Sequence, residues 1–263
     1  MLHKSFFETY RYNIISTGFF QDETNQLREN CRQNGVTVNS AISVAFLAGR
    51  KKIVADYNNN IQGIGVNIRN RLKNPVDRSA FGCFVSDIGF KFEYLDEHGF
   101  WDNVRLYHQK MKDELETYKD LQSLIALSDM DSSLMEALTF ARHINYNPGK
   151  FDDHDKLSVL SKNNKHIATK LAKQGLSEYP GLLITNLGAL KMPSVYGSLS
   201  VEKIFFGPSS IPLPDGGLII SAVSCNEKLS VTVNVMAPLQ NEGFLKRIEC
   251  ISKTAIMVLQ QAM

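Results

Sequence analysis

Histidine is the side chain that most often serves as a general base near neutral pH, so the histidines of this chain are the first candidates for chemistry. The 263-residue sequence has six, and no two are adjacent: His3, His98, His108, His143, His154 and His166. His154 falls in a polar stretch and is expected to be solvated. His108 and His143 fall on predicted helices, where a partly buried, hydrogen-bonded imidazole is expected. These positions alone predict no catalytic pair.

Other common chemistries lack their sequence signatures. The chain has no GxxxxGK[ST] phosphate loop, no HExxH metal motif and no GxSxG nucleophile elbow. The QGIGVN segment lacks the third glycine and the following helix of a dinucleotide-binding loop. The four cysteines are far apart and form no CxxC pair, which predicts no bound metal and a reduced, cytoplasmic protein.

Charge and hydropathy exclude further classes. The formal net charge is +2 and no long run of one sign appears, so a polyanion partner is not expected. A basic cluster at Arg69, Arg71, Lys73 and Arg78 has few interleaved aromatics and no recognition motif, so we expect no nucleic-acid role. No apolar run approaches the roughly 18 residues of a spanning helix, and the N-terminus is a poor signal peptide. We therefore expect no membrane span.

Periodicity and turn signals predict a mixture of helices and strands. Helices are expected at 23–34 (capped by Asp22 and ended by Gly35), 38–57 (opened by Thr37 or Asn39), 101–127, 132–146, 165–174 and 241–261. Strands are expected at 61–72, 81–95, 181–190 and 197–207, and a hairpin at 216–236 with its turn at Asn226-Glu227. Residues 147–158 resemble a polar linker. The spacing is too uneven for a regular parallel βαβ array, so we expect an α/β (α+β) fold with a mixed, largely antiparallel sheet.

Four segments, taken in order, resemble the CoA-dependent acyltransferase superfamily, which includes chloramphenicol acetyltransferase, condensation domains, alcohol acetyltransferases and the plant BAHD enzymes. Residues 35–49, GVTVNSAISVAFLAG, resemble the opening of the superfamily's second half. Residues 66–86 resemble its strand and loop with Arg-x-Arg and a later Gly, here Arg69, Arg71 and Gly82. Residues 182–190 resemble its Ser-Asn-x-Gly strand end, here Thr185, Asn186 and Gly188. Residues 196–210 resemble the strand with Asp-Phe-Gly-Trp-Gly.

The resemblance implies a chloramphenicol acetyltransferase-like sheet flanked by helices, in one subdomain at 21–263 after a lead-in or linker at 1–20. It implies acyl transfer from a CoA or phosphopantetheine thioester to a small alcohol or amine, with no covalently bound cofactor. Arg69, Arg71 and Gly82 would be structural loop residues, and Asn186 would orient the thioester or stabilise an oxyanion. The residues expected to line the substrate tunnel are Asn186, Gly188, Phe206, Gly207 and Ser209.

The sequence departs from the family at two points. It matches only the second half of two-halved members and contains no His-His-x-x-x-Asp-Gly, the motif whose second His is the general base. His98 with Asp102 is the nearest substitute, but Glu97 replaces the first His and Asn103 replaces the Gly. Phe205 stands where the family has the Asp that pairs with Arg-x-Arg, so Arg69 needs another partner.

Two functions follow from this half-length match. In the first, the chain is the C-terminal subdomain of an acyltransferase or condensation-type enzyme, inactive alone, and an N-terminal half on the same or a separate polypeptide supplies the base. In the second, it is a non-catalytic binding or self-association module that keeps the fold. A homo-oligomeric enzyme with its site between subunits is a variant that would need His98 as base.

Overall fold

The computed structural model describes residues 10–54, 57, 59–77, 79–121, 159, 180–208, 217–238 and 241–263. The chain divides into a unit of residues 1–120 with 180–263 and a unit of residues 121–179. Nearly all described residues belong to the first unit. The helices predicted at 132–146 and 165–174, the predicted linker and Ser209 lie outside the described residues.

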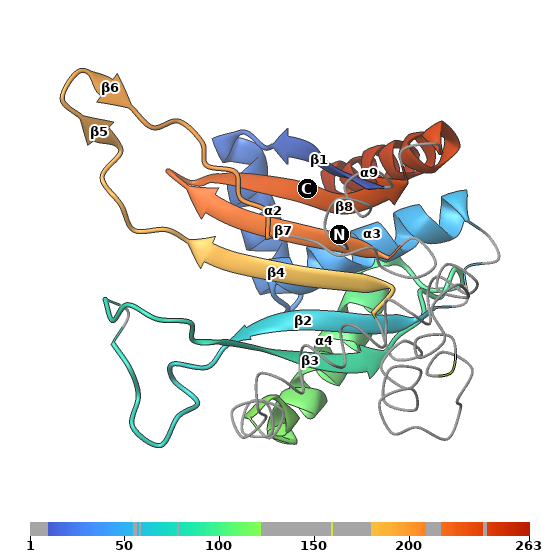
Figure 1. Cartoon of the computed structure of the whole chain (residues 1–263), viewed down its shortest axis with the longest axis horizontal. Coiled ribbons are helices and arrows are strands. Elements are labelled where there is room, and N and C mark those ends of the chain that lie inside the picture. Colours follow the sequence, from blue (N-terminus) through green and yellow to red (C-terminus); the bar gives the residue numbers. More distant parts are fainter. Residues whose placement is uncertain are drawn as a thin grey trace. The chain divides into compact units, whose positions relative to one another are not determined.

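A six-stranded mixed sheet forms the centre of this unit (Figure 1). Its order is β1-β8-β7-β4-β2-β3, from β1 (Tyr10–Gly18) through β8 (Lys228–Pro238), β7 (Leu218–Cys225), β4 (Leu182–Ala189) and β2 (Ile61–Asn67) to β3 (Val85–Lys91). The β2–β4 and β4–β7 pairings are parallel and the other three are antiparallel. The expected mixed, largely antiparallel sheet is confirmed.

Four helices pack against one face of the sheet, behind it in Figure 1. They are α2 (Gln21–Gln33), α3 (Val38–Ile53), α4 (Phe100–Glu116) and α9 (Glu242–Gln261). Alternate strand residues face them and join one apolar core, for example Ile184 of β4, Ile220 of β7 and Val233 of β8. Because strand side chains alternate between faces, the intervening residues point to the opposite face.

Helix α3 lies at the centre of the helical layer, and all residues from Ser40 to Arg50 are buried. Thr37 caps it as predicted, since its side chain accepts a hydrogen bond from the Ser40 amide. A Cβ added at Gly49 would lie 2.8 Å from the Ile251 carbonyl oxygen of α9. Glycine at this position therefore lets the two helix backbones approach closely.

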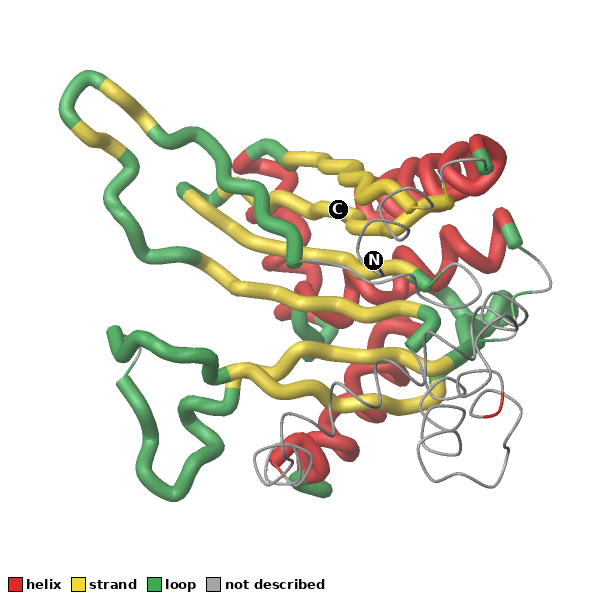
Figure 2. The backbone as a smooth tube through the Cα atoms, viewed as in Figure 1, coloured by secondary structure: helices red, strands yellow, loops and turns green. Residues whose placement is uncertain are grey.

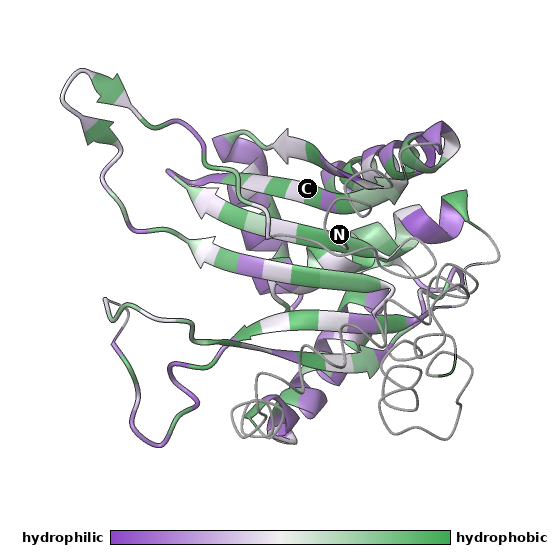
Figure 3. Cartoon of the chain, viewed as in Figure 1, coloured by the Kyte–Doolittle hydropathy of each residue, from purple (hydrophilic) through white to green (hydrophobic). Residues whose placement is uncertain are grey.

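The hairpin of β7 and β8 is largely buried, and both strands carry many apolar residues (Figure 3). Its turn lies at Asn226 and Glu227, as predicted, with φ values of +48° and +60°. Two consecutive positive φ angles characterise the tight turns whose twist matches that of the flanking strands. Six of the seven hairpin residues from Leu218 to Ser224 are buried, so both faces of β7 are covered.

Some predicted boundaries are wrong. Helix α2 begins at Gln21, and the Glu23 carboxylate accepts a hydrogen bond from the Phe20 amide, so Asp22 is not its cap. The strand predicted at 197–207 is reduced to β6 (Leu199–Ser200), which pairs with β5 (Val195–Tyr196) in a small separate hairpin. Helix α4 ends at Glu116, and a turn at Thr117 and Tyr118 interrupts the predicted helix before helical residues 119–121; residues 122–127 lie outside the described residues. Residues 10–18, within the segment expected as a lead-in, form strand β1.

Candidate functional site

The candidate site lies where the parallel strands β2, β4 and β7 end. Two long irregular segments leave the sheet there, residues 68–84 after β2 and residues 190–208 after β4 (Figure 2). Both extend to the left of the sheet in Figure 1. The carboxyl ends of parallel strands commonly carry the functional groups of α/β folds, because the loops that follow them meet at one edge. Most residues singled out from the sequence are in these two segments.

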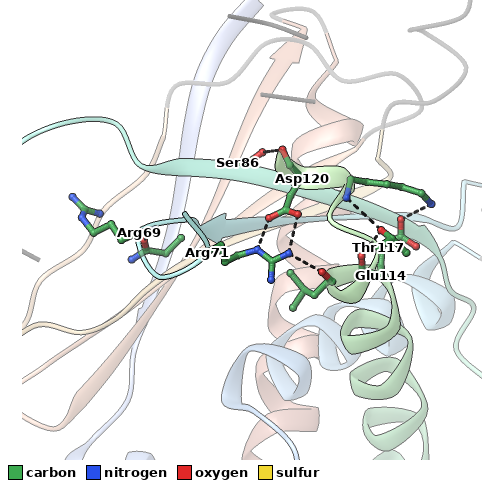
Figure 4. A network of polar contacts seen from close by, with 9 residues as sticks. Arg69, Arg71, Ser86, Glu114, Thr117 and Asp120 are labelled. Carbon is green, nitrogen blue, oxygen red and sulfur yellow. Dashed lines mark hydrogen bonds and ion pairs between the residues drawn. The ribbon is translucent and has the colours of Figure 1, made fainter. Parts of the chain in front are cut away.

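Arg71 lies in a buried polar network at this end (Figure 4). Its Nε and Nη2 donate to the two carboxylate oxygens of Asp120 at 2.7 and 3.0 Å, and Nη2 also donates to the Leu115 carbonyl at 2.6 Å. Asp120 is fully buried, and its backbone carbonyl accepts a hydrogen bond from the Ser86 hydroxyl at 2.8 Å. The network joins the β2 loop, β3 and the end of α4. These contacts fix the Arg71 side chain between the loop and α4.

Among the described residues, Arg69 has neutral contacts and no ion pair. Its Nη2 donates to the Ala80 carbonyl at 3.2 Å, and its guanidinium lies 4.4 Å from the centre of the Phe84 ring. Gly82 approaches the same ring so closely that an added Cβ would be 2.8 Å from it. Arg69, Phe84 and Gly82 thus close the base of the 68–84 loop. The family that the sequence resembles has an Asp where this chain has Phe205. Here the Arg69 guanidinium contacts the Ala80 carbonyl and the Phe84 ring instead.

Asn186 and Gly188 lie together in a tight turn where β4 ends. The Asn186 side-chain oxygen accepts a hydrogen bond from the Gly188 amide at 2.8 Å, and Gly188 has a φ of +72°. Its Nδ2 group has no hydrogen-bond partner among the described residues. Asn186 pairs with Ala222 of β7, whose side chain belongs to the helix-side core, so Asn186 projects toward the helical face.

Phe206 and Gly207 lie on the opposite face. A Cβ at Gly207 would be 2.1 Å from Asn234 Oδ1, so this glycine rests directly on the β8 side chain. The Tyr12 hydroxyl lies 2.8 Å from the Pro208 carbonyl and 2.7 Å from Asn234 Oδ1, and burial raises the pKa of Tyr12. These contacts hold the segment against the sheet. The structure therefore does not bring Asn186 and Gly188 together with Phe206 and Gly207.

A row of hydroxyl side chains crosses the face of the sheet opposite the four helices, and its central members, Ser221 and Thr232, are buried. The paired positions run from β4 across β7 and β8 to β1: Thr185, Ser221, Thr232 and Ser16. A Cβ at Gly65 of β2 would lie 3.2 Å from Thr185 Oγ1, so glycine at this position leaves room for the threonine side chain. Only Thr185 of this row was predicted from the sequence. The polar residue at every second position of SVTVN was the available signal.

His98 is far from these groups along the sheet. It is exposed and precedes α4, on the stretch that follows β3. Because β2 and β3 are antiparallel, that stretch lies at the opposite end of the sheet from the 68–84 loop. Asp102 pairs with Arg105 rather than with His98, and Asn103 bonds the carbonyls of the preceding turn. The geometry gives no support to His98 as a base.

His108 is buried between α3 and α4. Its Nδ1 lies 3.0 Å from the Ser40 hydroxyl, which contacts the Thr37 hydroxyl at 2.9 Å. Burial and the nearby Lys112 lower the pKa of His108. Ser40 is fully buried, so this Ser–His pair is inaccessible to a substrate and packs the helices together.

Other features of the described residues lie outside this end of the sheet. A cavity of about 160 Å³, lined by residues such as Val54, Asn60 and Tyr94, lies near the start of β2. It is below the usual size of a ligand pocket, about 300 Å³ or more. Within the described ranges, no three candidate metal ligands come together, and no helix has the length and apolarity to cross a bilayer.

This arrangement is that of the chloramphenicol acetyltransferase-like acyltransferase fold, as the sequence resemblance implied. No protein-family model matches the chain, and no curated protein matches its sequence. Solved structures do match. The epimerization domain of tyrocidine synthetase B is 11% identical with a TM-score of 0.55, and the match covers 96% of this chain and 49% of that one. The condensation domain of the Monacolin K polyketide synthase MokA is 8% identical with a TM-score of 0.57 and coverages of 95% and 47%.

An acetyltransferase and an ester synthase show the same likeness. TRI3 trichothecene 15-O-acetyltransferase from Fusarium sporotrichioides is 12% identical, with a TM-score of 0.54 and coverages of 95% and 47%. The wax ester synthase/diacylglycerol acyltransferase from Marinobacter aquaeolei VT8 is 11% identical, with a TM-score of 0.53 and coverages of 95% and 49%. At these identities the likeness establishes the fold, and the chain spans about half the length of these proteins.

Proposed function

We propose that this chain is the C-terminal subdomain of an acyltransferase or condensation-type enzyme. It would form one wall of the substrate tunnel, while an N-terminal half with the His-His-x-x-x-Asp-Gly motif removes the proton from the acceptor. The observation that carries the proposal is the fold match, which covers at least 95% of this chain and about half of several enzymes. Two of these enzymes, by name, transfer acyl groups to hydroxyls.

The donor in this proposal is an acyl-CoA or phosphopantetheine thioester, and the acceptor is a small alcohol or amine. Asn186 would donate its Nδ2 hydrogen to the thioester carbonyl or to the oxyanion formed from it, because its oxygen is already engaged by Gly188. The segment with Phe206, Gly207 and Ser209 would line another stretch of the tunnel. The proposal needs no metal and no covalently bound cofactor, and it assigns the chain to the cytoplasm.

The test compares the chain alone with the chain paired with a companion half that carries the histidine motif. We expect acyl transfer from acetyl-CoA to a simple alcohol only in the pair, and loss of transfer when the motif's second His is replaced by Ala. Turnover by the isolated chain would overturn the proposal, because it would place a general base within residues 1–263.

The alternative is a non-catalytic module that keeps the fold and associates with itself. It is favoured by exposed apolar side chains near the end of β4 and in the segment that follows it, such as Leu187 and Leu199, at 53% and 72% exposure. Sedimentation analysis of the isolated chain tests it. A stable dimer without transfer in any pair would favour the module, whereas a monomer that gains activity with its companion would exclude it.

A further inference from the structure

The segment of residues 201–208 crosses the face of the sheet opposite the helices and is irregular at every position. Gly207 lies on the Asn234 side chain of β8, and Lys203 lies beside β1, since a Cβ added at Gly18 would be 2.9 Å from the Lys203 side chain. No ladder of strand hydrogen bonds fixes such a segment. Its place on the sheet therefore depends on a few side-chain contacts.

Tyr12 of β1 provides the contact at the end of this segment. Its hydroxyl lies 2.8 Å from the Pro208 carbonyl and 2.7 Å from Asn234 Oδ1, so it links the segment to both β1 and β8. Asn234 is fully buried, and its Nδ2 donates to the Ser221 hydroxyl at 2.8 Å. Both ends of the Asn234 amide are thereby engaged. Without the Tyr12 hydroxyl, a buried amide oxygen would lose its donor, which is costly because that oxygen has already given up its water.

Gly207 fixes the register of the segment at the same point. A Cβ at this position would lie 2.1 Å from Asn234 Oδ1 and 3.2 Å from the Tyr12 hydroxyl, so only a residue without a side chain fits. A shift of the segment by one residue would place Phe206 or Pro208 against Asn234, where neither side chain has room. The Tyr12–Asn234 contact therefore sets where the segment lies along β8.

The part of the segment held by this contact is apolar and partly open. Residues 204–208 have the sequence IFFGP and carry no charge. Phe205 is 46% exposed, and Gly207 is exposed although one side of it rests on Asn234. Such a surface offers no charged partner to the phosphates of a thioester donor, whereas it can remove hydrocarbon from water. It is therefore suited to the acyl chain of the donor.

We infer that Tyr12 is a positioning residue: through Pro208 and Asn234 it holds residues 204–208 where they line the path of the donor's acyl chain. This inference rests on the proposed function and narrows its donor to a thioester with an acyl chain of several carbons. Tyr12 itself contacts no reacting atom. Its loss should therefore weaken the binding of long acyl chains and leave the chemical step unchanged.

The experiment measures transfer from acetyl-CoA and from octanoyl-CoA to a simple alcohol by the pair of this chain and its companion half. Tyr12→Phe should raise KM for octanoyl-CoA about tenfold, which corresponds to lost burial of about two methylene groups at roughly fourfold each. KM for acetyl-CoA, and kcat for both donors, should change by less than about twofold. Gly207→Ala displaces the segment from Asn234 while the Tyr12 hydroxyl remains, and it should give the same pattern.

Tyr118→Phe is the matched control, because it removes the hydroxyl of a tyrosine that is 56% exposed, and it should change neither constant. A second readout needs only this chain. The NMR order parameter of the Gly207 amide should be about 0.85 in the unmodified chain and in Tyr118→Phe, and below about 0.6 in Tyr12→Phe.

Equal changes in KM for the two donors, or a Gly207 order parameter that Tyr12→Phe leaves as it is, would overturn the inference, while transfer by the pair leaves the proposed function intact. A lower kcat for both donors with unchanged KM would also overturn it, because a purely structural role of Tyr12 would inactivate a fraction of the pair. Absence of transfer from both donors in every pair would refute the proposed function and the inference together.

Discussion

Removal of the Asp120 carboxylate should destabilise the protein strongly, although the residue is on no predicted motif. Asp120→Ala removes two charge-assisted hydrogen bonds from Arg71. At about 1.5–3 kcal/mol each, these two bonds set an upper range of about 3–6 kcal/mol. The Arg71 side chain is 21% exposed and keeps its hydrogen bond to the Leu115 carbonyl. In the variant, water and this carbonyl therefore compensate part of the hydrogen bonding that the guanidinium loses. We expect a loss of about 2–4 kcal/mol in the free energy of unfolding.

Urea denaturation followed by circular dichroism measures this loss, and a thermal scan should show a melting temperature lower by roughly 4–16 °C. Lys119→Ala is the matched control, since its neighbouring ion pair with Glu114 is exposed on the lysine side and should contribute less than about 1 kcal/mol. The double variant Arg71→Met, Asp120→Ala should cost less than the sum of the two single changes, because neither charge then remains buried alone.

Two results would contradict this reasoning. An Asp120→Ala variant within about 0.5 kcal/mol of the Lys119→Ala control would mean that the buried pair contributes no more than an exposed one. Strict additivity in the double variant would mean that Arg71 and Asp120 do not interact in solution. In either case, the structural role assigned to Arg71 would have to be withdrawn.

Three further outcomes are expected. Gly49→Ala should lower the free energy of unfolding by about 1–3 kcal/mol despite alanine's higher helix propensity, because its Cβ meets the Ile251 carbonyl; an unchanged urea midpoint would contradict the close α3–α9 contact. Folding lowers the pKa of His108, so as the pH drops below about 6.5 the unfolded chain takes up a proton before the folded chain does. The free energy of unfolding should therefore fall with the pH. Urea titrations at pH 7.5 and 5.5 measure this fall, and it should be smaller in His108→Gln. Asn186→Ala should reduce acyl transfer by the reconstituted pair by about 10²-fold with an unchanged melting temperature, and full activity would remove Asn186 from the site.

The sequence correctly predicted the features that depend only on neighbouring residues. The Thr37 cap, the turn at Asn226-Glu227 and the stop at Gly35, with its φ of +66°, each depend on neighbouring residues and were found as expected. Strand β1 was not predicted, because an edge strand with one face in water has no clear alternation of polar and apolar residues. Tyr12 helps to hold this strand in place through a hydroxyl contact to Asn234, 222 residues away in the chain. The strand predicted at 197–207 had the right residue types but pairs only at its start.

The candidate site was predicted in part. The sequence singled out Arg69 and Arg71, and their assignment as structural loop residues stays a prediction. It did not identify the partner of Arg71, because Asp120 lies 49 residues later in the chain. No sequence spacing distinguishes that carboxylate from the other acidic residues nearby. The assignment of Asn186 and Phe206 to a tunnel remains a prediction.

The alternation of side chains along β4 has a consequence for the size of any ligand. Asn186 projects toward the helical face, whereas Gly207 rests on Asn234 at the opposite face. A compact molecule that binds on one side of the sheet would contact one of these residues only. A molecule that touches both must be elongated and must pass around the end of the strands, as a chain-like acyl group or a long thioester arm would. With a shortened donor, acyl transfer should therefore no longer depend on one of the two residues, Asn186 or Gly207. The residue that loses its effect would show from which side the donor enters.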